Sequence, residues 1–206
     1  MTDHAVAFRP RLISTSTVPS PSIDPAAEES TLQAAEQAFR QLLSVQPRHV
    51  RTLCSLAMVR LQRGDTEEAR KLLGQAADLT GQSADTLLMV GKAYASLGEL
   101  ANAASHLERA VAIDADNADA HNSLGLCYQQ LGQFERAIAH HEAAIAIRPH
   151  FAAGFAGLGD ACRQLDRHHD AIAYYRRALS VTPQAPALLL NLGGCYHATA
   201  QLDAAI

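Results

Sequence analysis

The sequence repeats itself with a period of 34 residues, and this period constrains the fold more than any other feature. The dipeptide Leu-Gly occurs at Leu124-Gly125, Leu158-Gly159 and Leu192-Gly193, and the same step separates Ala137 from Ala171, Ala144 from Ala178, and Pro149 from Pro183. A unit of this length cannot bury its own apolar face, so it must stack on similar units. The sequence therefore predicts a linear array rather than a compact globular domain.

Each unit is expected to hold two helices, as residues 118–151 illustrate. Tyr128 lies on the first helix, and Gly132 supplies the left-handed backbone conformation that ends it. Phe134 begins the second helix, and Pro149 prevents that helix from continuing. Glycine and alanine recur where the two helices would cross, because a larger side chain would force the backbones apart. We therefore expect each unit to be a closely packed helical hairpin.

The period divides the chain into segments. We expect a disordered tail rich in Pro, Ser and Thr over 1–24, an N-terminal helix that is a degenerate half-repeat or cap over 25–49, full units over 50–83, 84–117, 118–151 and 152–185, and a truncated partial unit over 186–206. A targeting role is the alternative for the tail, because Arg9 and Arg11 are basic. In the last unit Gln201 is expected to open the second helix, which stops at Ile206. This ending suggests a fragment of a longer chain.

Charge and composition narrow the classes of partner. The formal net charge of −4 and the isoelectric point near 6.2 argue against a nucleic-acid-binding protein, which needs a clustered basic face. No run of about 18 apolar residues is present, so no membrane span is expected, and no secretory signal is recognised. The four cysteines have no CxxC spacing, which favours reduced thiols and a cytoplasmic protein.

The residue types that carry catalysis or hold metals do not form a pattern here. Adjacent histidines such as His140-His141 point about 100° apart on a helix, so such a pair does not easily chelate one ion. A histidine that fills an aromatic position or lies on a wet outer face is the simpler interpretation. Cys127 and Cys195 occupy the same position two periods apart, as buried packing residues would. We therefore expect no catalytic residue, no metal and no cofactor within these residues.

The pattern L-G-x2-Y, then Ala, then an aromatic residue, then Pro, at a spacing of about 34, resembles the tetratricopeptide repeat (TPR) family. The resemblance runs from about residue 26 to 206 and is strongest in 118–151 and 152–185. It implies an all-α fold, a right-handed α-solenoid of antiparallel helix hairpins. It also implies a scaffold or recruitment module that binds protein or peptide segments along a concave groove lined by the first helix of each hairpin.

Carried onto this sequence, the resemblance identifies candidate groove residues. They are Arg51, Met58, Gln62, Asp85, Lys92, Asp119, Asn122, Leu126, Gln129, Gln130, Asp160, Arg163, Gln164, Asn191 and His197, with Cys54, Leu88, Ser96 and Leu190 among them. A clamp for a C-terminal carboxylate, one known use of such repeats, would need polar residues where Cys54, Met58 and Leu88 stand. That use is not expected here.

Two alternatives to a free-standing scaffold stay open. Long arrays of this kind resemble the substrate-recruiting arms of larger transferases, such as sulfotransferases and O-linked glycosyltransferases, whose catalytic domain would lie beyond residue 206. The asparagine ladder of the glycosyltransferases is mostly absent, since only Asn122 and Asn191 fall near its line. The second alternative is self-association through the incomplete C-terminal hairpin.

Overall fold

The computed structural model describes residues 25–81 and 83–205, and within these ranges the chain forms helices and no strands. The helices are α1 (Pro25–Val45), α2 (Val50–Gln62), α3 (Thr66–Asp78), α4 (Ala84–Leu97), α5 (Leu100–Ile113), α6 (Ala118–Gln130), α7 (Phe134–Ile147), α8 (Ala152–Gln164), α9 (His168–Val181) and α10 (Pro186–Ala205). The predicted tail over 1–24 lies outside the described residues. The expected all-α fold is confirmed.

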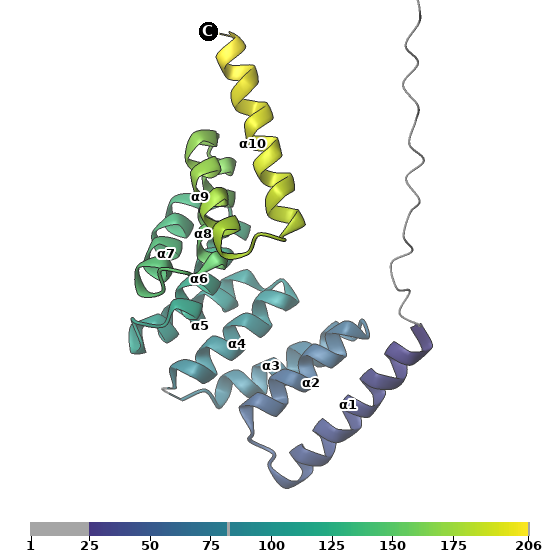
Figure 1. Ribbon diagram of the computed structural model, residues 1–206. Coiled ribbons are helices and arrows are strands. Elements are labelled where there is room, and N and C mark those ends of the chain that lie inside the picture. The colour runs from purple at the N-terminus through teal and green to yellow at the C-terminus, as the bar shows by residue number, and fades with distance from the viewer. Residues whose placement is uncertain (1–24, 82, 206) are drawn as a thin grey trace, which may run out of the picture.

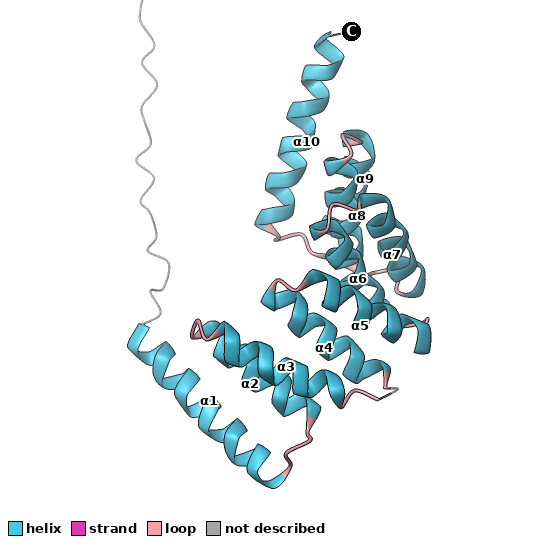
Figure 2. Ribbon diagram, turned by 180° about the vertical axis from the view of Figure 1, so that it is seen from behind, coloured by secondary structure: helices cyan, strands magenta, loops and turns pink. Residues whose placement is uncertain are grey.

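The helices pair as hairpins and the hairpins stack in chain order. Helix α2 packs on α3, α4 on α5, α6 on α7 and α8 on α9, and each hairpin contacts the next. The first helix of each hairpin begins at the first residue of its predicted unit. Figures 1 and 2 show the resulting array, with α1 at one end and α10 at the other. The molecule is an α-solenoid in which each hairpin is covered by its neighbours.

One repeat position ends the first helix of each hairpin. Gly64, Gly98 and Gly132 stand 34 residues apart there, and their φ angles are 82°, 83° and 73°. The next residue at this step is Asp166, whose φ of 55° is also left-handed. The left-handed turn expected at Gly132 is thus present, and it recurs along the array.

The last helix differs from the prediction. A second helix was expected to open at Gln201, but α10 continues without a break from Pro186 to Ala205. The residue 34 positions after Asp166 is Ala200. Alanine rarely adopts the left-handed conformation, whereas glycine adopts it freely and aspartate does so occasionally, so the turn that ends the other first helices is not formed at Ala200. In both views the far end of α10 extends beyond its neighbours (Figures 1 and 2).

Glycines allow the two helices of a hairpin to cross closely. A Cβ added at Gly91, Gly125 or Gly159 would lie within 2.7 Å of a side chain on the second helix of the same hairpin. At Gly193, the same position in α10, a Cβ would meet nothing within 4 Å. The predicted close packing is therefore confirmed in the complete hairpins, whereas no described side chain lies close to Gly193.

The first helices lie on the inner side of the stack. Besides their hairpin partners, α2 contacts α4, α4 contacts α6 and α6 contacts α8. First helices that approach one another in this way line the concave side of a curved array. The candidate groove residues belong to these helices and to α10.

Candidate binding groove

Clefts lie between neighbouring first helices, and three of them share lining residues. The N-terminal cleft, between α2 and α4, is lined by Arg51, Cys54, Ser55, Met58, Asp85, Leu88, Met89, Lys92, Ala93 and Ser96. The middle cleft, between α4 and α6, is lined by Lys92, Ala95, Ser96, Leu107, Ser123, Leu126, Cys127 and Gln130. The C-terminal cleft is lined by Gln129, Gln130, Phe134, Asp160, Arg163, Gln164 and Asn191. Lys92 and Ser96 line the first two clefts and Gln130 the last two, so the three join into one groove.

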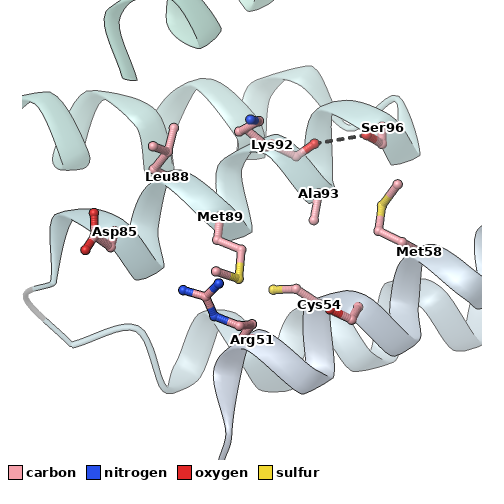
Figure 3. A pocket seen from close by; sticks show the side chains of 10 residues that line it. Arg51, Cys54, Met58, Asp85, Leu88, Met89, Lys92, Ala93 and Ser96 are labelled. Carbon is pink, nitrogen blue, oxygen red and sulfur yellow. Dashed lines mark hydrogen bonds between the residues drawn. The ribbon is translucent and has the colours of Figure 1, made fainter. Parts of the chain in front are cut away.

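The N-terminal cleft has an apolar floor and encloses about 560 Å³. Figure 3 shows Cys54 and Met58 on one wall, with Leu88 and Met89 on the other. The Cys54 side chain is nearly fully buried, and this burial raises the pKa of its thiol to about 11. The thiol is therefore protonated at neutral pH, and it acts as a small apolar surface rather than as a nucleophile.

The rim of the N-terminal cleft carries three charged side chains. Arg51, Asp85 and Lys92 are exposed, and none of them takes part in an ion pair with another described residue. The Ser96 hydroxyl donates a hydrogen bond to the Lys92 backbone carbonyl oxygen at 3.1 Å and does not contact the Lys92 ammonium (Figure 3). These three groups are available to a ligand.

The C-terminal cleft is polar, and much of its hydrogen-bonding capacity is used within the protein. Asp160 accepts hydrogen bonds from the Tyr175 hydroxyl at 2.6 Å and from the Asn191 side-chain amide at 3.1 Å. The Gln129 side-chain amide donates to the Gly157 carbonyl oxygen at 2.7 Å. A ligand in this cleft would have to compete with these contacts, unlike one in the N-terminal cleft.

Most of the candidate groove residues line at least one of the three clefts. They are Arg51, Met58, Asp85 and Lys92 in the N-terminal cleft, Leu126 and Gln130 in the middle cleft, and Gln129, Asp160, Arg163, Gln164 and Asn191 in the C-terminal cleft. Gln62, Asp119 and His197 are exposed but line none of these clefts. The Asp119 carboxylate instead forms an ion pair with Arg148 at 2.9 Å.

Asn122 was expected to face the groove, but its side chain lies in the interior of the hairpin. Its side chain is 9% exposed, and its amide oxygen lies 3.0 Å from Nδ1 of His141, a fully buried residue. The amide is therefore directed to the interior of its hairpin, because the histidine at this junction needs a polar partner. The same step of 34 places Cys54 and Leu88 at the cleft wall, so the repeat position alone did not distinguish these roles.

Ser55 and Met89 line the N-terminal cleft but were absent from the sequence prediction. Both lie at the repeat position of Asn191, which was a candidate. Steps of 34 backwards from Asn191 lead to Gly157, Ser123, Met89 and Ser55. The repeat period could therefore have identified Met89 and Ser55 as groove candidates.

His141 and the four cysteines are buried packing residues. His141 fills the position that Leu107 and Tyr175 occupy in the neighbouring hairpins, as the aromatic-slot interpretation predicts. All four cysteines are buried and free. No three His, Cys, Asp or Glu side chains in the described ranges are grouped to hold a metal ion.

Stacked helical hairpins with a continuous concave groove define a repeat protein of the α-solenoid class. Family models described as TPR repeat or tetratricopeptide repeat match residues 28–85, 91–132, 116–184 and 163–206. Together these matches cover almost all of the chain from α1 onward. The chain belongs to the tetratricopeptide repeat family.

Solved structures of TPR proteins have the same architecture. MamA is 27% identical with a TM-score of 0.61, and the match covers 78% of this chain and 94% of MamA. A thermophilic TPR protein from Thermus thermophilus is 22% identical with a TM-score of 0.65, over 84% of this chain and 94% of that one. YrrB is 18% identical with a TM-score of 0.61, over 80% of this chain and 85% of YrrB. The last two likenesses show the fold alone.

No curated protein matches the sequence at a significant level. Across residues 25–81 and 83–205, no helix combines the length and the apolar character needed to cross a membrane.

Proposed function

We propose that this protein binds extended protein or peptide segments in its concave groove and acts as a scaffold or recruitment module. The continuity of the groove carries this proposal, because Lys92 and Gln130 each line two successive clefts. A single extended segment could thus contact all three clefts. YrrB, which shares the fold, is a TPR protein with an unusual peptide-binding site. The four free, buried cysteines support the cytoplasm as its place of action.

A display library of random peptides tests this function without assuming a ligand sequence. Peptides selected on the intact protein are expected to lose binding to Ser96→Trp, because Ser96 is exposed and lines both the N-terminal and the middle cleft. The matched control is Ser105→Trp on α5, also exposed but on a second helix. Selection of no peptide, or loss of binding to the Ser105 variant alone, would refute groove binding.

A further inference from the structure

Two of the three methionines of the chain lie in the N-terminal cleft, Met58 on α2 and Met89 on α4. Their unbranched thioether side chains adapt to irregular apolar shapes better than branched residues do. Leu88 and the buried, protonated Cys54 complete the apolar lining (Figure 3). A cleft with this lining suits one large apolar side chain, such as Leu, Met or Phe.

The charge at this end of the groove is positive, although the whole chain carries −4. Arg51 and Lys92 are opposed by one carboxylate, Asp85, and none of the three has an ion-pair partner within the described ranges. Among the residues that line the middle cleft, Lys92 alone is charged. An anionic group beside the apolar cleft would therefore find two unneutralised cations, and a cationic group would have to face them.

We propose that the N-terminal cleft anchors a large apolar residue of an extended peptide, and that Asp or Glu residues next to this anchor lie at Lys92 and Arg51. This inference rests on the proposed function and names the class of partner.

Capped, fluorescein-labelled peptides with both termini blocked test the ligand side. The reference peptide carries one leucine with two aspartates on each side, between Gly-Ser spacers. Replacing leucine by alanine should weaken binding roughly 10- to 100-fold, because a buried leucine side chain is lost. Replacing all four aspartates by asparagine should weaken it roughly 5-fold or more and remove most of its salt dependence.

Variants of the intact protein test the cleft side. Lys92→Glu should weaken binding of the aspartate peptide roughly 10-fold, because attraction becomes repulsion. The same variant should bind a peptide with lysine in place of aspartate better than the parent protein does, and this gain cannot come from misfolding. Lys71→Glu, an exposed lysine on α3 outside the groove, is the matched control and should bind like the parent.

The outcomes separate this inference from the proposed function. Equal affinity for the aspartate and asparagine peptides, or no effect of Lys92→Glu, would overturn the acidic-apolar partner. If the random library then yields other groove-binding peptides, groove binding stands and only the partner class is wrong. If neither the library nor the defined peptides bind, the proposed groove binding and the acidic-apolar partner are both wrong.

Discussion

Identical residues at one repeat position have different roles because their neighbours differ. Gly125 on α6 faces His141 of α7, whose ring would lie 2.7 Å from an added Cβ. Gly193 on α10 occupies the same repeat position, and the space beside it is open. The glycine is required only where a second helix crosses it.

This difference predicts opposite effects of one substitution. Gly125→Ala should destabilise the protein by roughly 1–3 kcal/mol, because the added Cβ overpacks the hairpin. Gly193→Ala should be neutral or stabilise α10 by up to about 1 kcal/mol, since alanine favours a helix over glycine. Chemical denaturation of both variants measures the difference, and equal effects would contradict the packing at Gly125.

His141 is the most deeply buried titratable group of the hairpin formed by α6 and α7. It lies between Gly125 and Gly157, its Nδ1 faces Asn122, and its Nε2 has no hydrogen-bond partner among the described residues. Burial, with a smaller effect of neighbouring His140, lowers the pKa of His141 to about 4. The folded protein therefore holds this imidazole neutral at neutral pH.

Stability should consequently fall as the pH falls below about 6.5, where the unfolded chain binds a proton at His141 and the folded protein does not. The contribution is fully present above pH 6.5 and is lost towards pH 4, by an amount on the order of 2–3 kcal/mol. His141→Leu, the residue type at position 107, should flatten this part of the stability profile. The exposed His169→Leu is the control and should retain the parent's slope between pH 4 and 6.5.

At the scale of the element, one position decides where a first helix ends. Gly64, Gly98 and Gly132 adopt a left-handed φ there, Asp166 adopts it at a steric cost, and Ala200 does not adopt it. Helix length in this array thus depends on a single residue per unit more than on the helical propensity of the segment.

Replacing Asp166 by glycine should therefore stabilise the protein by roughly 1 kcal/mol, because the left-handed conformation costs an L-residue about that much. The exposed contact of Asp166 with His168 at 3.8 Å contributes little against this gain. Gly132→Asp is the reciprocal variant and should destabilise by a similar amount. Thermal melts compare the two, and a loss of stability in Asp166→Gly would show that its carboxylate matters more than its backbone.

At the scale of the whole molecule, the stack is held by contacts between neighbours, so each end depends on one interface. Helix α1 is joined to α2 through Glu36, whose side chain is 8% exposed. Its carboxylate lies 2.8 Å from Arg60 and 2.5 Å from Arg63, both near the end of α2. This carboxylate is the main polar connection between α1 and the array.

Glu36→Ala should release α1 without unfolding the hairpins formed by α6 to α9. Removing the Glu36 carboxylate takes away the partner that Arg60 and Arg63 share and leaves Asp65 for Arg60 and Glu29 for Arg63, so α1 should be held more weakly. Hydrogen exchange should therefore accelerate across α1 and stay unchanged in α6 to α9. Glu29→Ala removes a more exposed partner of Arg63 and should have a much smaller effect. Faster exchange throughout the array would instead indicate global cooperativity.

The sequence by itself determined the architecture and most of the groove. A period of 34 residues, with glycine at the turns and small residues at the helix crossings, places each hairpin, because these signals are local and recur in register. The start of every complete hairpin and most cleft residues follow from it.

Only the tertiary structure decided how individual side chains at one repeat position are used. Asn122 turns inward because His141, 19 residues away in the sequence, needs a partner in the interior of the hairpin. In the C-terminal cleft Asp160 accepts hydrogen bonds from Tyr175 and Asn191, whereas Lys92 in the N-terminal cleft forms no ion pair with another described residue. Helix α10 continues through Ala200, where the other first helices end at a residue with a left-handed φ. These outcomes depend on contacts between residues distant in the sequence, which a periodic pattern does not encode.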